Sequence, residues 1–313
     1  MNTVAIITPS YNNIDGLKRL VVSLEQLTWP KEKIKLYICD DGSTDDTVNY
    51  FTELDCEIEI EVLKLSKNSG PAKARNLGLD KAKADLILFL DSDLTVAPDL
   101  IEKHIACYKQ VSVVGVRGEN KTFGNEKRNK WQRYLDSSLR GPRKAYAQTG
   151  KREVTYKEVN TNNFSIRGSV LNLELRFDEK IIHYGGEDMI FAYELSKQNR
   201  GQILYEPKAM IFHEHRGFMA TMAKMEEYGK ETIHYLLQTY PETYSDLVIS
   251  RFYKPDGKQE KKFWSRIIVN NFGAFVAHGL WRLLPDVMAF RVLQYIMAWY
   301  VLKGYREGLN GNE

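Results

Sequence analysis

Two aspartates two residues apart, Asp91 and Asp93, follow the apolar run 86–90, which predicts a buried strand. Carboxylates placed where a strand ends in a loop can hold Mg²⁺ or Mn²⁺. Diphosphate oxygens and water would complete the coordination shell, and the cation would neutralise charge on a departing diphosphate. Ser92, between the two aspartates, belongs to the same predicted binding loop. An Asp-Ser-Asp turn also closes strands that bind no metal, so this pair alone leaves both interpretations open.

A second acidic pair, Glu187 and Asp188, follows two glycines and opens the helix predicted over 188–198. The helix dipole stabilises an anion at this end, so Asp188 would be ionised and ready to accept a proton, as a general base must be. We also expect Gly186, the second glycine, to be one of the ligand-binding residues. Aspartate also caps many structural helices, and capping is the competing explanation.

Polar residues follow the first two predicted strands as well. Residues 8–12 read Thr-Pro-Ser-Tyr-Asn, and Asp40 and Asp41 begin a turn rich in Asp, Gly, Ser and Thr. In an open α/β sheet, ligands bind beyond the carboxyl ends of the strands. A carboxylate there can accept a hydrogen bond from a base or a ribose, and Tyr11 can stack on a base. Ordinary strand-to-helix turns use the same residue types, so each motif alone is weak.

Histidine and basic residues supply further candidates. In the sequence His-Glu-His-Arg after a short predicted strand, His213 can be a third metal ligand, and His215 or Arg216 can face a phosphate. Lys73 and Arg75 lie on a predicted helix that follows a Gly-Pro turn. They can reach a phosphate or a nucleobase, or they can be ordinary surface charges.

These residues need a scaffold that brings strand ends together. Short β-rich runs alternate with amphipathic helical stretches, which predicts the α/β class with a mostly parallel sheet and covering helices. The expected strands are 4–7, 34–39, 57–65, 86–90, 111–116, 159–166 and 210–212, and the expected helices are 15–27, 45–54, 71–84, 188–198 and one begun by Pro98.

The stretch 117–158 departs from this alternation. It holds twelve Lys or Arg against five acidic residues, interrupted by Trp131, Tyr134 and Tyr146. We interpret it as a loop or irregular helix. It is either a solvated, mobile flap or a lid that meets an anionic ligand.

The composition of the 313 residues excludes several classes of protein. With 43% hydrophobic and 27% charged residues, the chain is neither disordered nor disulfide-rich, and a net charge of +3 gives no reason to expect nucleic acid as a partner. The three cysteines lack zinc-site spacing and favour a reducing compartment. The chain has no basic leader and no apolar run long enough to cross a bilayer, so we expect a cytoplasmic protein.

Aromatic residues gather near the C-terminus. Trp264, Trp281, Trp299 and Tyr300 lie among apolar runs and basic residues between 263 and 309. Aromatic and basic residues on amphipathic helices suit peripheral contact with the inner face of a membrane, or a lipid-linked acceptor. A helical region that packs on the sheet or on a second subunit of a homo-oligomer is equally compatible, and the sequence does not separate them.

The order of the motifs is more specific than any one of them. The motifs TPSYNN, CDDGSTDDT, NSGPAKARNLGL, LDSD, NTNNFSIRG, GGEDMIFAYEL and HEHRG succeed one another between residues 3 and 217. This succession resembles the family-2 inverting glycosyltransferases of the GT-A fold. The resemblance implies a GT-A catalytic domain at 1–217 and a C-terminal helical region at 218–313. The basic insertion at about 117–158 makes this stretch longer than the usual spacing between the family's motifs. The resemblance therefore does not define the acceptor-binding side of the site.

The resemblance also implies a role for each matching residue. Asp91 and Asp93 would hold the metal and the diphosphate, with Asp93 as the direct ligand and His213 as a late metal-binding histidine. Asp188 would be the catalytic base, beside Glu187 in the acceptor-site motif. The nucleoside pocket would be lined by Pro9, Tyr11, Asp41 and Arg75. The donor sugar would lie next to Asn162 and Asn163. The remaining residues of the donor site would be Lys73, Ser92, Gly186 and Arg216.

These implications favour an enzyme that transfers a hexosyl or N-acetylhexosaminyl group from a nucleoside diphosphate, in which we expect the nucleoside to be uridine. The acceptor would be a hydroxyl of a glycan or of a lipid-linked molecule. The reaction would belong to the synthesis of cell-envelope polysaccharide. Asp188 would take the proton in a single in-line displacement that inverts configuration. A nucleotidyltransferase is one alternative, and the Glu187-Asp188 pair argues against it. A catalytically silent sugar-nucleotide-binding module is another, and the intact carboxylates argue against it.

Overall fold

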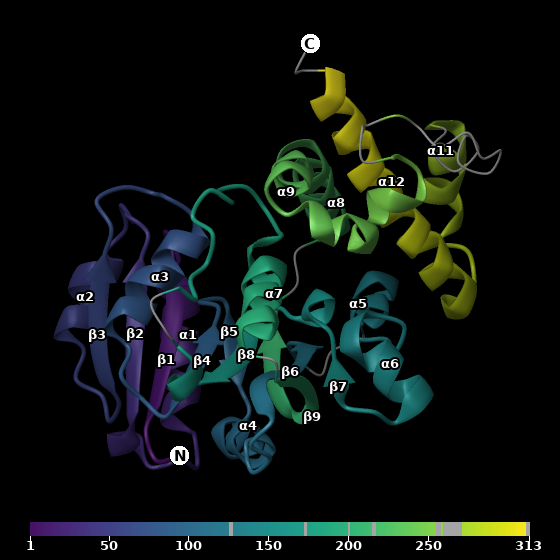
Figure 1. The fold of residues 1–313 in the computed structure, drawn as a ribbon. Coiled ribbons are helices and arrows are strands. Elements are labelled where there is room, and N and C mark those ends of the chain that lie inside the picture. Colours follow the sequence, from purple (N-terminus) through teal and green to yellow (C-terminus); the bar gives the residue numbers. More distant parts are fainter. Residues whose placement is uncertain are drawn as a thin grey trace. The chain divides into compact units, whose positions relative to one another are not determined.

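The computed structural model describes residues 1–124, 128–171, 174–199, 201–214, 217–254, 258 and 271–310. The chain divides into two compact units. The first, which contains the sheet, comprises residues 1–126, 135–182 and 187–215, and the second, which is helical, comprises 127–134, 183–186 and 216–313 (Figure 1). A division of the protein into domains at residue 217 stays a prediction.

The N-terminal half of the first unit is a parallel sheet with strand order β3-β2-β1-β4. Each connection between consecutive strands contains a helix. All five residues of β4 are buried, as expected for a strand covered on both faces. The strands are β1 (Val4–Ser10), β2 (Ile34–Asp40), β3 (Glu59–Lys64) and β4 (Leu86–Leu90), and the helices are α1 (Ile14–Glu25), α2 (Thr47–Glu53) and α3 (Pro71–Lys81).

The sheet continues from β4 with antiparallel pairs, in the order β4-β8-β6-β9-β5, and β7 pairs with β9. Only β6 and β9 are parallel neighbours in this half of the described sheet. The strands are β5 (Leu94–Val96), β6 (Val113–Thr122), β7 (Glu153–Val154), β8 (Asn163–Arg167) and β9 (Gln202–His213), and the helices are α4 (Leu100–Cys107), α6 (Gly141–Thr149) and α7 (Glu187–Asn199).

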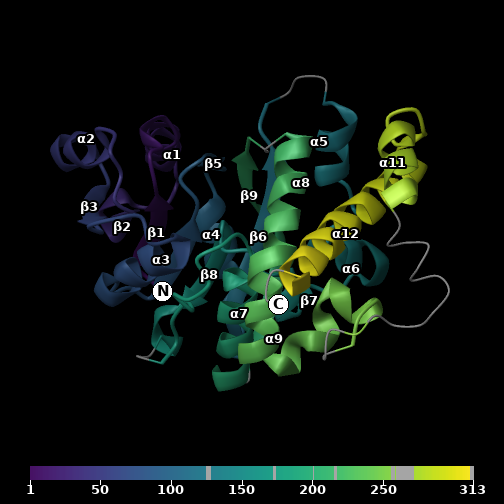
Figure 2. The same ribbon diagram turned by 90° about the horizontal axis from the view of Figure 1, so that it is seen from above.

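The core lies in two layers, one on each face of the sheet, because side chains alternate along a strand. Ile6 and Leu88 belong to the layer under α1, whereas Ile7 and Phe89 belong to the layer under α3 (Figure 2). In the second layer, the rings of Phe177 and Phe191 stack with centroids 4.1 Å apart. The predicted α/β class with covering helices is confirmed, and the strand predicted at 86–90 is β4.

The interpretation of 117–158 as a loop or irregular helix is wrong where strands form, at 117–122 and 153–154. Strand β6 extends to Thr122, and α6 and β7 follow in the same stretch. Arg117 and Glu119, which look solvent-exposed in the sequence, are buried in β6. The Tyr205 hydroxyl donates a hydrogen bond to Glu119, and Arg143 approaches the same carboxylate at 3.5 Å. These partners make charged residues compatible with a core strand.

A second buried polar cluster lies around His104 of α4. Its Nε2 donates to Asn163 Oδ1 at 2.9 Å, and its Nδ1 is 2.9 Å from the Ser165 hydroxyl. The Tyr108 hydroxyl is in turn 2.9 Å from that of Ser165. A neutral imidazole satisfies these partners, and burial lowers the pKa of His104 to about 4.

This lowered pKa predicts acid sensitivity. The unfolded chain, with a histidine pKa near 6.5, binds a proton that the folded protein excludes, so stability is lost as the pH falls below that value. For wild type, we expect His104 to remove about 2 kcal/mol of unfolding free energy between about pH 7.5 and about pH 5. Urea denaturation at both pH values should show a smaller loss in His104→Gln. An exposed histidine variant, His183→Gln, is the control, and an equal loss in His104→Gln and wild type would contradict the assignment.

The second unit consists of helices. A π-helical segment (Tyr228–Thr232) joins α8 (Phe218–Glu227) to α9 (Ile233–Thr239). Gly304 allows α12 to lie against the end of α8, because a Cβ there would be 2.0 Å from the Glu226 carbonyl oxygen. No helix among the described residues is both long and apolar enough to cross a membrane. The helices are α5 (Lys130–Leu135), α8 (Phe218–Glu227), α9 (Ile233–Thr239), α11 (Asn271–Leu280) and α12 (Asp286–Asn310).

Candidate active site

Strand pairing brings the predicted site residues of the first unit together. Leu90, the last residue of β4, is paired with Asn163, the first residue of β8. Asp91 therefore leaves the sheet beside Asn162. The neighbouring strand β1 is parallel to β4 and also ends at this edge. This is the position at which open α/β sheets bind ligands.

Arg75 of α3 occupies the centre of an acidic cluster. Its guanidinium donates a hydrogen bond to Asp91 Oδ1 at 2.9 Å and lies 3.4 Å from Glu187 Oε1 and 3.6 Å from Asp188 Oδ1. The Arg75 side chain is 5% exposed, so these contacts are largely shielded from solvent. One buried cation thus joins the end of β4 to the first turn of α7.

Three carboxylates around one guanidinium leave the cluster with excess negative charge. Burial and the charge of Asp188 raise the pKa of Glu187 to about 7, although Arg75 acts in the opposite direction. Burial also raises the pKa of Asp91 against the effect of Arg75. Burial alone would lower the pKa of Arg75, but the three carboxylates outweigh it and raise that pKa. The cluster therefore favours the binding of additional positive charge.

Asp188 is held by two neighbours. The Thr161 hydroxyl donates a hydrogen bond to its Oδ1, and Arg75 approaches the same oxygen. Asp188 lies in the first turn of α7, as predicted, where the helix dipole stabilises an anion. Thr161 is fully buried and was not among the predicted site residues. Its position next to Asn162 in the motif NTNNFSIRG is the sequence signal that could have identified it.

Asp93 and His213 form a second pair of potential ligands. His213 Nε2 is 3.2 Å from Asp93 Oδ1, because Leu94 of β5 and His213 of β9 are partners in the sheet. A carboxylate and an imidazole suit Mn²⁺ or Mg²⁺ whose remaining ligands come from a diphosphate. Asp91 faces Arg75 instead. Within the described residues, no group of three His, Cys, Asp or Glu side chains is arranged to hold a metal. The residues present thus fit a site with two protein ligands.

The predicted nucleoside residues lie around the ends of β1 and β2. Asp41 accepts hydrogen bonds from the amides of Ser69 (2.7 Å) and Gly70 (2.8 Å), and burial raises its pKa in spite of them. Tyr11 is 47% exposed and can stack on a base, and Pro9 is partly buried in β1. These positions are compatible with a nucleoside pocket, which stays a prediction.

The two predicted asparagines differ in their surroundings. Asn162 Oδ1 accepts a hydrogen bond from Asn120 at 2.8 Å. Asn163 is fully buried, and its Nδ2 donates to the carbonyls of Glu119 (3.1 Å) and Ala209 (2.9 Å). In this arrangement Asn163 supports the strand ends through core hydrogen bonds, and its contact with a donor sugar stays a prediction. Asn120 was missed because it lies in the stretch interpreted as a loop.

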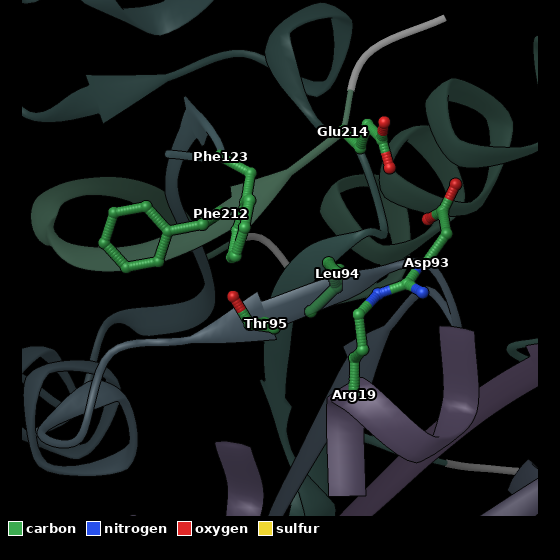
Figure 3. Close-up of a pocket in the computed structure, with 7 residues that line it drawn as sticks. All are labelled: Arg19, Asp93, Leu94, Thr95, Phe123, Phe212 and Glu214. Carbon is green, nitrogen blue, oxygen red and sulfur yellow. The ribbon is translucent and has the colours of Figure 1, made fainter. Parts of the chain in front are cut away.

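A small pocket adjoins Asp93. Its volume is about 140 Å³, below the roughly 300–1,000 Å³ of typical small-molecule sites, so it can hold only part of a ligand. Figure 3 shows the side chain of Arg19 extending toward Asp93. The pocket is lined by Arg19, Asp93, Leu94, Thr95, Phe123, Phe212 and Glu214.

The remaining predicted residues have more peripheral positions. Ser92 accepts a hydrogen bond from Asn13 Nδ2 at 2.9 Å, which ties the Asp91–Asp93 loop to the start of α1. Lys73 is exposed on α3 and lies 3.9 Å from Glu179. Gly186 belongs to the second unit and has a φ of +97°. Arg216, like His215, lies outside the described residues. The roles of these residues stay predictions.

Comparison with known proteins identifies the family. The model of glycosyl transferase family 2 matches residues 5–164. An uncharacterized glycosyltransferase of Haemophilus influenzae is 31% identical over 217 residues, which cover 68% of this chain and 79% of that protein. The pre-mycofactocin glycosyltransferase of Mycobacterium tuberculosis is 31% identical over 263 residues, 79% of this chain, and the match spans 50% of that relative's length. The chain belongs to glycosyl transferase family 2 and is a glycosyltransferase.

Solved structures show the same fold. The chain resembles TarS of S. aureus in complex with UDP, with a TM-score of 0.55 and 18% identity over 98% of this chain and 92% of that one. It also resembles the mannosyltransferase PcManGT of Pyrobaculum calidifontis in complex with GDP-Man and Mn²⁺, with a TM-score of 0.64 and 15% identity over 99% and 88% of the two chains. These likenesses confirm the GT-A fold.

The acidic cluster predicts a specific role for Arg75 in stability. Arg75→Met removes the buried cation and should lower the unfolding free energy by about 3 kcal/mol. Adding Glu187→Gln should restore part of this loss, because it removes one uncompensated carboxylate. Urea denaturation of both single variants and the double variant measures the coupling. Lys73→Met, on the exposed face of α3, should have little effect, and strictly additive losses would contradict the cluster.

Proposed function

We propose that this glycosyltransferase inverts configuration and moves a hexosyl or N-acetylhexosaminyl group from UDP to a hydroxyl of a glycan or lipid-linked acceptor. The observation that carries the proposal is the shared contact of Asp188 and Asp91 with Arg75. It joins the candidate base to the strand end at which the donor diphosphate would bind. A base and a leaving-group site so close together suit a direct displacement.

Asp188 is proposed as the general base. The Thr161 hydroxyl and the Arg75 guanidinium both face Oδ1, so Oδ2 is the oxygen available to take the acceptor proton. As the acceptor hydroxyl attacks the anomeric carbon, its proton passes to Asp188, and the bond to the diphosphate breaks on the opposite face. A single displacement of this kind inverts the anomeric configuration.

Asp93 and His213 are proposed to hold a divalent cation, Mn²⁺ or Mg²⁺. When bound, this cation would neutralise negative charge on the departing diphosphate. Asp93 is the better candidate for direct coordination because Asp91 already faces Arg75. The Mn²⁺ in the PcManGT complex supports divalent-cation use in this fold.

Uridine is proposed as the base of the donor nucleotide. Asp41 can accept a hydrogen bond from the imide N–H of uracil, and UDP in the TarS complex supports this choice. Guanine also carries a ring N–H donor, and PcManGT is in complex with GDP-Man. Uridine and guanosine donors should therefore be tested side by side.

The base assignment predicts a separation of binding from chemistry. Asp188→Asn keeps the shape and the Thr161 contact but cannot take a proton, so transfer should fall roughly 10²- to 10⁴-fold while UDP affinity stays near that of wild type. The assay is transfer from a panel of UDP- and GDP-sugars to glycan and lipid-linked acceptors, with calorimetry for UDP binding. Glu194→Gln, later on α7, is the control.

Unimpaired transfer by Asp188→Asn would remove Asp188 from this role. The same panel tests the alternatives. Release of pyrophosphate from a nucleoside triphosphate and a sugar phosphate would indicate a nucleotidyltransferase. Nucleotide binding with no transfer to any acceptor by wild type would indicate a silent binding module.

A further inference from the structure

The helical unit carries an exposed apolar surface. On α11, Phe272, Phe275, Val276 and Leu280 follow the i, i+3, i+4, i+8 spacing of one helix face, and all four are exposed. The surface continues through the turn at Leu283, which is 82% exposed, to the first turns of α12. We call this surface the hairpin face, and it consists of Phe272, Phe275, Val276, Leu280, Leu283, Val287 and Met288.

The opposite side of the hairpin is already packed. Ala274 and Ala277 of α11 are buried, and so is Trp281 in the turn that follows it. Ala289 and Phe290 are buried on α12. Trp281, an aromatic residue that the sequence offered for membrane contact, is thus part of the packed side. The inner side of the hairpin is therefore packed without any contribution from the outward apolar residues. A stripe of this kind marks a site of interaction with another apolar surface.

Two backbone oxygens of the turn between the helices, those of Arg282 and Leu284, are hydrogen-bonded from within the unit. Lys130 Nζ donates to the carbonyls of Arg282 (2.7 Å) and Leu284 (2.6 Å), and Arg133 binds both carboxylate oxygens of Asp286 at 2.8 and 2.9 Å. Carbonyls at a helix end otherwise need water. Because Lys130 supplies these hydrogen bonds, the turn around Leu283 can enter an apolar medium without leaving the carbonyls of 282 and 284 unbonded.

The charges around the hairpin face are basic. Arg282 and Arg291 are exposed beside it, and Asp286, the one acidic residue in the sequence 271–291, is bound to Arg133. A partner that matches this surface is apolar at its centre and anionic around it.

We infer that the hairpin face inserts into the interfacial region of a bilayer that contains anionic lipid. Insertion would bury the exposed aromatic and aliphatic side chains, while the arginines meet lipid phosphates. A symmetric contact between two copies of this face is disfavoured because it would bring the arginines of both copies together. The surface lies outside the acidic cluster described above, so it adds an interaction to the proposed function.

Vesicle co-sedimentation of the purified full-length protein tests the inference. Wild type should bind vesicles of phosphatidylcholine with phosphatidylglycerol more tightly than vesicles of phosphatidylcholine alone. Phe275→Ser combined with Leu283→Ser should weaken binding roughly tenfold or more, since two large apolar side chains are lost. Arg282→Glu with Arg291→Glu should remove the dependence on anionic lipid. Val22→Ser with Val111→Ser, two exposed apolar residues of the first unit, is the matched control and should bind like wild type.

Two further measurements check the variants, and vesicle binding together with sedimentation velocity distinguishes a membrane from a second copy of the chain. Circular dichroism checks that each variant is folded, and transfer to a water-soluble acceptor should be unchanged in the Phe275→Ser, Leu283→Ser variant. Equal vesicle binding by this variant and wild type would overturn the inference. A wild type that binds no vesicles but self-associates in sedimentation velocity, and becomes monomeric in the same variant, would assign the hairpin face to a second copy.

Discussion

The guanidinium of Arg75 joins segments that are far apart in the sequence. It lies on α3, contacts Asp91 at the end of β4, and faces Glu187 and Asp188 at the start of α7. An arginine is suited to this position because it stays charged when buried and offers several donors in a fixed plane. The free-energy cost of burying the guanidinium is offset only while the carboxylates remain in place. The contacts between Arg75 and the carboxylates therefore fix the site geometry, and they also hold excess negative charge next to the proposed diphosphate position.

The parallel half of the fold could be predicted from the sequence because its signals are local. Strand β4 is a run of five apolar residues. Helix α7, in the other half, is also marked locally, because it begins at an acidic pair after two glycines. The acidic residues of the site were found for the same reason, since each stands at the end of a strand or the start of a helix. Arg75 was also found, as a basic residue on a predicted helix with a phosphate or a base as its expected contact. Its contact with three carboxylates depends on tertiary packing, which no local pattern records.

The full course of β6 could not be predicted because it depends on buried polar groups. Strand β6 carries Arg117 and Glu119 into the core, where a hydropathy pattern expects apolar residues, and its continuation was therefore interpreted as a loop. Burial lowers the pKa of Arg117 to about 10, which still leaves it charged at neutral pH beside Glu119. Likewise, the exposure of the hairpin face depends on which side of α11 packs inward. Because α11 is apolar on both sides, the sequence alone does not show which side that is.

A sugar nucleotide is proposed to bind at the strand ends with a divalent cation held by Asp93 and His213. The most direct measurement is calorimetric titration of the purified protein with UDP and with GDP, each in Mn²⁺ and in EDTA, repeated for Asp93→Asn and His213→Gln. We expect Mn²⁺-dependent binding of UDP to wild type that both variants weaken markedly. Binding that is equal in Mn²⁺ and EDTA, or undiminished in Asp93→Asn, would contradict it.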